Sequence, residues 1–160
     1  MRFSIALIAA YAAFVQAGVF TKQTYNDISI SGGVAGNAEE EALSVFSALD
    51  MNNLAAADKD DIDFLKSVNK ICNEAEEEAF NTAIDDASGE AAKALQRGKI
   101  KNKVLKLEAT VLRLKIQQAQ GEDVSDEMAK ELKKLNNNIK QDEDEAGQPS
   151  TALSFDATTK

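Results

Sequence analysis

Apolar residues recur every three or four positions along most of the chain, the spacing typical of amphipathic helices. The clearest series runs from Ile100 to Leu114 and resumes from Met128 to Ile139, behind Ser125 or Asp126 as the helix cap. Residues 121–123 interrupt the series, which predicts an antiparallel helical hairpin folded at this point. The positions that would face each other are 104 with 139, 107 with 135, 111 with 132 and 114 with 128.

Two earlier helices show the same spacing. Asn37 is placed to cap the first, which we expect to end near Asp50. Asp58 is placed to cap the second, which we expect to reach residue 88. Gly89 and Gly98 predict a short helix over 90–96, with a kink or stop before residue 100. A second apolar stripe on the 100–116 helix gives it surface to bury against the earlier helices, so the sequence predicts an all-α antiparallel bundle of four to five helices over residues 38–141.

The segments flanking the predicted bundle lack helical spacing. Residues 18–37 are rich in glycine and predict a flexible N-terminal arm in which Ile28 and Ile30 form at most one short strand. Residues 142–160 begin with an acidic run and contain the only proline, Pro149. This composition predicts a disordered, acidic and polar C-terminal tail.

The first 17 residues have the pattern of a signal peptide. Arg2 gives a positive start, an apolar run extends from Phe3 to Phe14, and Val15 and Ala17 are small residues at the cleavage-site positions. The run is shorter than the roughly 20 residues of a membrane-spanning helix, and no later segment is as apolar. The sequence therefore predicts a secreted, extracellular protein that has no membrane span and is placed in the medium or the cell wall.

Charge and cysteine content narrow the picture further. The formal net charge is −9, and Cys72 is the only cysteine. Cys72 falls on the apolar stripe of the second helix, which predicts a buried, unbridged thiol and a monomer; a dimer through Cys72 is the alternative. The chain lacks an Asn-x-Ser/Thr sequon for N-glycosylation.

The residues present exclude most catalytic chemistry. The chain has no histidine, which removes the commonest general base and the usual zinc ligand. The acidic run Asp58–Asp63 resembles a calcium loop, but Asp63 stands where the loop needs glycine and Asn69 where it needs glutamate. We therefore predict a protein that is not an enzyme, with no catalytic residue, no cofactor-binding residue, no metal ligand and no cofactor.

A basic segment over residues 97–115 stands out in this acidic chain, with Glu108 as its only acid. It either forms a surface for an anionic partner or pairs with the acidic helix over residues 58–90. No aromatic residue lies between Phe80 and Phe155, so the segment offers no platform for stacking bases, and we predict no nucleic-acid partner.

Several stretches resemble a family of small secreted proteins of filamentous fungi. They are Ile28–Asn37, Phe80–Ile84, Ala87–Gly89 and Ala94–Leu107. The resemblance covers nearly the whole chain after residue 17 and implies a fungal extracellular protein, associated with the cell wall or a candidate effector at a host interface. It implies no activity and transfers no functional residue.

These observations together favour a secreted, non-enzymatic interaction protein. Its expected partner is a wall polymer or a host protein, and its place of action is the fungal cell wall or the host interface. The alternative is an extracellular carrier that holds a lipid or another apolar small molecule in the bundle core.

Overall fold

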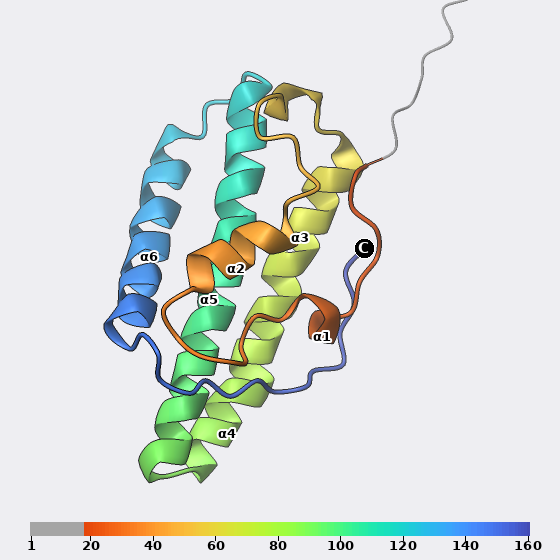
Figure 1. Cartoon of the computed structure of the whole chain (residues 1–160). Helices are drawn as coiled ribbons and strands as arrows, with labels where there is room; N and C mark the ends of the chain where they lie inside the picture. Colours follow the sequence, from red (N-terminus) through yellow and green to blue (C-terminus); the bar gives the residue numbers. More distant parts are fainter. Residues whose placement is uncertain (1–17) are drawn as a thin grey trace, which may run out of the picture.

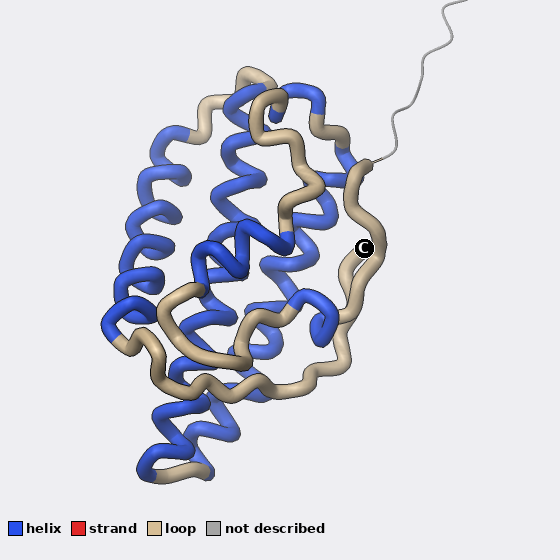
Figure 2. The backbone as a smooth tube through the Cα atoms, viewed as in Figure 1, coloured by secondary structure: helices blue, strands red, loops and turns tan. Residues whose placement is uncertain are grey.

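Helices joined by loops make up the part of the chain that this computed structural model describes, residues 18–160 (Figures 1 and 2). The predicted signal peptide, residues 1–17, lies outside the described residues. The elements are α1 (Tyr25–Ile28), α2 (Ala38–Val45), the 3-10 turn η1 (Leu54–Ala56), α3 (Lys59–Glu74), the π-helical turn η2 (Ala75–Phe80), α4 (Asn81–Asp86), α5 (Gly89–Ala119) and α6 (Ser125–Asp144). The all-α helical bundle predicted from the sequence is confirmed.

Helix α5 is the centre of the bundle. It packs against α3 on one side and α6 on the other, and α2 crosses it on a third side (Figure 1). Between Ala94 and Ile116 most of its side chains are buried, including the polar side chains of Lys101 and Asn102. The predicted hairpin is α5 with α6: Leu107, Val111 and Leu135 are buried in the core.

Helix α3 forms where the sequence places both a cap and an apolar stripe. The carboxylate of Asp58 accepts hydrogen bonds from the backbone N–H groups of Asp60 (2.7 Å) and Asp61 (3.1 Å), which satisfies donors that the first helical turn leaves free. Leu65, Val68 and Cys72 then face the core. The chain continues through η2 into α4 without leaving the helix axis (Figure 1).

Gly98 does not end a helix, contrary to the prediction of two helices over 90–96 and 100–116. Helix α5 runs unbroken from Gly89 to Ala119. The C-terminal segment crosses α5 at Gly98, where a Cβ atom would overlap the carbonyl oxygen of Thr151 and lie 3.1 Å from the ring of Phe80. Glycine is present here because backbone passes over backbone.

The predictions of a flexible arm at residues 18–37 and a disordered tail at residues 142–160 are wrong, because the two segments pair with each other. Helix α6 extends to Asp144, and the chain then runs antiparallel to the arm. The backbone N–H groups of Tyr25, Ala35, Gly147, Ser150 and Thr159 donate across this pairing to the carbonyls of Ala157 (2.8 Å), Gln148 (3.0 Å), Ala35 (2.9 Å), Gly33 (2.9 Å) and Gln23 (2.8 Å). Each segment satisfies polar backbone groups of the other.

The cap of α2 also differs from the prediction. Asn37 is the first flanking residue, but its side chain makes no capping hydrogen bond. The carboxylate of Asp142, from the end of α6, accepts instead from the backbone N–H groups of Gly36 and Ala38, both at 2.9 Å. The helix ends at Val45, before the predicted Asp50. Asp142 therefore couples α6 to α2 across the bundle.

Candidate functional site

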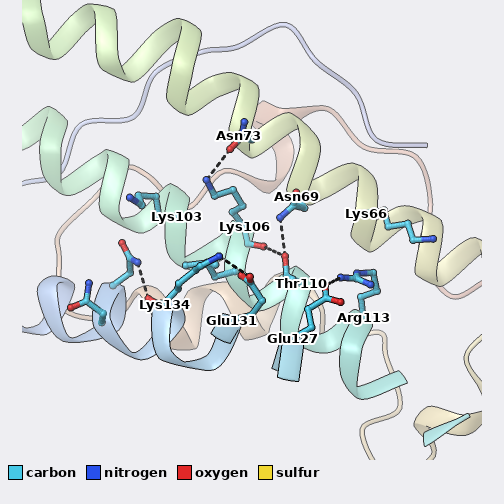
Figure 3. Close-up of a pocket in the computed structure, with 13 residues that line it drawn as sticks. Lys66, Asn69, Asn73, Lys103, Lys106, Thr110, Arg113, Glu127, Glu131 and Lys134 are labelled. Carbon is cyan, nitrogen blue, oxygen red and sulfur yellow. Dashed lines mark hydrogen bonds and ion pairs between the residues drawn. The ribbon is translucent and has the colours of Figure 1, made fainter. Parts of the chain in front are cut away.

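A polar groove of about 770 Å³ lies between α3, α5 and α6 (Figure 3). It is open to solvent, and its floor contains one apolar side chain, that of Leu107. The side chains that surround it are charged or bear amides or a hydroxyl: Lys66, Asn69, Asn73, Lys103, Lys106, Thr110, Arg113, Glu127, Glu131, Lys134, Asn137 and Asn138.

The groove is on the opposite face of α5 from α2. Lys101 contacts the arm and Glu41 of α2, so its side chain marks the α2 face. Thr110 follows Lys101 by nine residues, which is two and a half helical turns, and it therefore points the other way. Lys103, Lys106 and Arg113 flank Thr110 on this second face (Figure 3).

Polar side chains at helical spacing from the two neighbouring helices complete the groove. Lys66, Asn69 and Asn73 lie along one stripe of α3, and Glu127, Glu131 and Lys134 lie along one stripe of α6 (Figure 3). A further helix packed here would need apolar stripes on all three helices. Because these stripes are polar, the groove between α3, α5 and α6 is left open to a polar ligand.

Cations outnumber carboxylates in the groove. Lys106 and Lys103 share Glu76, with N–O distances of 2.6 and 3.5 Å. Arg113 pairs with Glu127 and Lys134 with Glu131, both at 2.7 Å. Lys66 has one acidic partner among residues 18–160, Asp63, at 3.9 Å. The five basic side chains of the lining are therefore incompletely neutralised by their neighbours.

The protonation of Glu76 is held by these lysines. Burial raises the pKa of its carboxyl, but the hydrogen bond from Lys106, together with the charges of Lys106, Lys103 and Lys99, more than offsets burial, and the net effect is a lowered pKa. Glu76 is therefore ionised at neutral pH, and its ion pairs fix the side chains of Lys103 and Lys106 beside the groove.

Amide groups along the groove are held in place by hydrogen bonds. The side-chain amide of Asn69 donates to the hydroxyl of Thr110 (2.8 Å), and Lys106 donates to the amide oxygen of Asn73 (3.1 Å). Asn138 donates to the backbone carbonyl of Lys134 (2.8 Å). These bonds leave amide donors and acceptors available to hydroxyl or carboxylate groups of a ligand.

The comparisons with known proteins give a family without a described activity. The sequence profile of the family described as "Domain of unknown function (DUF8454)" matches residues 20–154. The chain belongs to the DUF8454 family. No curated protein and no solved structure matches it. The match spans α3, α5 and α6 entirely, so every residue that lines the groove lies within the DUF8454 domain.

The basic segment of this DUF8454 chain divides between two roles. Arg97 pairs with Glu90 and Glu145 and donates to the carbonyl of Pro149 (3.0 Å), so it holds the C-terminal segment. Lys101 is fully buried and holds the arm. Lys103, Lys106 and Arg113 face the groove, and the first two also pair with Glu76 inside the acidic stretch 58–90. The pairing of the basic segment with the acidic stretch is therefore observed for Lys103 and Lys106, and an anionic partner stays a prediction.

The remaining sequence candidates are structural. Cys72 is fully buried, as predicted, and burial raises the pKa of its thiol to about 12. A disulfide to a second chain would require the core to open. Asp58 and Asp61, in the acidic run that resembles a calcium loop, serve as the capping pair of α3. No helix within residues 18–160 is long and apolar enough to cross a bilayer.

Sequence reasoning found the α5 side of the groove but missed the other two sides. Asn69 and Asn73 on α3, and Glu127, Glu131 and Lys134 on α6, were not singled out. The signal that could have found them is a polar stripe at helical spacing on each of three consecutive long helices, with no apolar face left to fill the space between them.

Proposed function

We propose that this DUF8454 protein is a secreted, non-enzymatic binding protein whose groove holds an acidic polysaccharide of a fungal wall or host surface. The observation that carries the proposal is the excess of basic over acidic side chains in a polar groove on a protein of net charge −9. Non-specific attraction by the whole molecule would favour cationic partners. An anionic ligand must therefore be recognised locally, by the groove.

The dimensions of the groove favour a chain-like ligand. Lys103 and Arg113 are ten residues apart on α5, a distance of about 15 Å along the helix axis. A single small anion reaches only one end of this row. A polymer with carboxylates at intervals reaches both ends, and its hydroxyl groups match the amides of Asn69 and Asn73.

The chemistry of the chain supports binding without catalysis. No histidine is present in the sequence, and the single thiol is buried with a raised pKa. The carboxylates of the groove, Glu127 and Glu131, each form an ion pair with a basic side chain, Arg113 and Lys134 respectively.

The carrier alternative is not favoured by the cavities in residues 18–160. A carrier of apolar molecules needs an enclosed, largely apolar pocket of several hundred Å³. The groove has sufficient volume but is lined by charged and amide groups. The cavity beside Val19 and Leu49 has a volume of about 100 Å³, which is too small.

The proposal is tested by retention on an immobilised polyuronate, with a neutral glucan as the comparison matrix. We expect the protein from residue 18 onward to be retained on the polyuronate at low salt, released by salt, and not retained on the neutral glucan. The double variant Lys103→Gln/Arg113→Gln should bind at least about tenfold more weakly, because two charge-assisted contacts are lost.

The matched control is Lys93→Gln/Lys140→Gln, which removes the same charge from exposed positions outside the groove. Its affinity should equal that of the unmodified protein. Equal weakening by both double variants would show that net charge, not the groove, governs retention. Absence of retention at low salt would overturn the proposal and shift attention to a host protein as partner.

A further inference from the structure

The first described residues, Gly18–Phe20, lie on the first turn of α3. The backbone N–H of Val19 donates to Oδ1 of Asp61 at 2.7 Å. The ring of Phe20 stacks on Phe64, with centroids 4.4 Å apart and planes at 13°, and meets the edge of Phe46 at 6.3 Å. Two hydrogen bonds, the second from the backbone N–H of Phe20 to the same oxygen at 3.4 Å, and two aromatic contacts therefore fix the position of this segment.

The backbone of Gly18 is surrounded by carboxylates. A Cβ atom on Gly18 would lie 2.8 Å from Oδ1 of Asp61, 3.2 Å from Oδ1 of Asp58 and 3.1 Å from the Cβ of Asp60. The nitrogen of a residue lies about 2.5 Å from its Cβ, since both are bonded to Cα. The nitrogen of Gly18 is therefore within about 6 Å of the carboxylates of Asp58 and Asp61, close enough for a positive charge on it to be attracted by both.

Within residues 18–160, no lysine or arginine forms an ion pair with Asp58, Asp60 or Asp61; the pairs nearby use Asp63. A cavity of about 100 Å³ adjoins the segment and is lined by Val19, Leu49, Asp50, Asn53, Ala56, Ala57, Asp58 and Asp61. Asp61 is 2% exposed and accepts hydrogen bonds only from backbone N–H groups. The nearest lysine in sequence, Lys59, pairs with Asp63. A positive charge at Gly18 would complete this cluster.

The sequence predicts that such a charge is created by processing. Hydrolysis of the Ala17–Gly18 peptide bond by a signal peptidase adds one water molecule, leaving a carboxylate on Ala17 and an amine on Gly18. An α-amino group has a pKa of about 7.7–8.0 and is protonated at lower pH. Before cleavage the same nitrogen is a neutral amide.

We propose that Gly18 is the first residue of the processed protein and that its ammonium group binds the carboxylates of Asp58 and Asp61, with Asp60 adding negative charge beside them. The inference rests on the secretion part of the proposed function and is independent of the groove. Removal of the leader then adds an ion-pair cluster to the folded state, and glycine lets the chain approach Asp61 closely, because a Cβ atom would lie 2.8 Å from its Oδ1.

A cation at a helix N-terminus is opposed by the helix dipole. At α3 this opposition is reduced for two reasons. The carboxylates of Asp58 and Asp61 already accept hydrogen bonds from backbone N–H groups at the start of the helix, and they place negative charge next to Gly18. The ionisable groups around the amine are Asp58, Asp60 and Asp61 from α3 and Asp50 from the preceding loop. All of them are acidic and stabilise the ammonium form.

The test compares three forms of the protein: one that begins with a free Gly18, one acetylated at Gly18, and one extended by Ala17, which moves the amine one residue away. The first form is released from a fusion by a protease that leaves no extra residue. We expect NMR titration to give an α-amino pKa about one unit above the ordinary range. Acetylation should lower the Tm by about 3 °C at pH 6.

The pH dependence of this difference has a definite sign. A pKa that is raised in the folded state adds stability that is complete below about pH 7.7 and is lost as the pH rises through the folded-state pKa. The Tm difference between the free and acetylated forms should therefore disappear above about pH 10. Asp60→Asn should reduce the pKa shift, and Asp86→Asn, which removes an exposed acid at the far end of α4, should leave it unchanged.

Two outcomes would overturn the inference, and they are distinguishable from failure of the groove. An N-terminus other than Gly18, found by mass spectrometry of the protein secreted from a fungal host, refutes the processing site. An ordinary α-amino pKa together with equal Tm values for the free and acetylated forms refutes the ion-pair cluster. Polyuronate retention should be the same for all three forms, so it tests the groove alone.

Discussion

Replacing Gly98 by alanine isolates the contact between α5 and the C-terminal segment. Inside an ordinary helix this change stabilises a protein by about 1 kcal/mol, because alanine has the higher helix propensity. Here the added methyl group would overlap the carbonyl oxygen of Thr151 and press against Phe80 at 3.1 Å. The structure therefore predicts that the usual sign is reversed.

The size of the effect follows from three contributions. Overpacking costs about 1–3 kcal/mol, and relief of the overlap by lifting the segment loses the hydrogen bond from Thr151 N–H to the carbonyl of Ala94, worth about 1 kcal/mol. The gain in helix propensity offsets about 1 kcal/mol. The net expectation is a loss of about 1–3 kcal/mol in the free energy of unfolding, or a Tm lower by about 3–10 °C.

Urea denaturation measures the change in stability, and amide hydrogen exchange at Thr151 and Ala35 shows whether the segment has lifted. Gln96→Ala is the control, since Gln96 is exposed on the same helix and its replacement should change stability by only a few tenths of a kcal/mol. A Gly98→Ala protein that is as stable as the unmodified one, with Thr151 still protected, would refute the reasoning.

Three further predictions concern buried polar groups and the thiol. Burial raises the pKa of the Glu108 carboxyl; the charge of Lys115 opposes this effect and that of Glu39 reinforces it. Because the pKa is higher in the folded protein than the value of about 4.3 in the unfolded chain, the free energy of unfolding falls as the pH rises from the unfolded-state pKa through the folded-state pKa. Glu108→Gln should therefore stabilise the protein by about 1 kcal/mol at pH 7 and by nothing below pH ~4 in thermal melts, and a loss at pH 7 would contradict this. Lys101→Met should cost about 2–4 kcal/mol in urea denaturation, because it removes the donor to the carbonyls of Gly32 (2.8 Å) and Val34 (3.0 Å) and the partner of Glu41; unchanged stability would show that these groups find water instead. Cys72, with its thiol pKa raised to about 12, should resist a thiol reagent at pH 8 until the protein unfolds, and rapid labelling of the native protein would indicate an open core.

The long helices could be predicted because their information is local. The spacing of Leu107, Val111 and Leu135 identifies the α5–α6 hairpin, and the cap at Asp58 identifies the start of α3. Residue 98 is the instructive exception. A glycine within a strongly periodic helix was interpreted as a stop, although the same signal fits a close approach of another backbone.

Features that depend on distant partners could not be predicted. The arm and the C-terminal segment are more than 100 residues apart, and their pairing uses mainly backbone groups, which leave little trace in the order of side chains. The same holds for Asp142 as the cap of α2 and for Lys101 as the donor to the arm. In the candidate site, Lys103, Lys106 and Arg113 belong to a basic segment that the sequence shows directly. The packing of α3 and α6 against α5 decides which basic side chains of that segment line the groove, and this packing could not be predicted.

The pairing of the arm with the C-terminal segment has a consequence for the order in which the protein is made. A ribosome synthesises the arm first and the segment from Gly147 to Lys160 last, at about 5–20 residues per second. Until those last residues emerge, the carbonyls of Gln23 and Gly33 and the N–H groups of Tyr25 and Ala35 have no partner from the chain. The pairing that joins the two ends of the described chain therefore forms only after the last residues of the protein have been made.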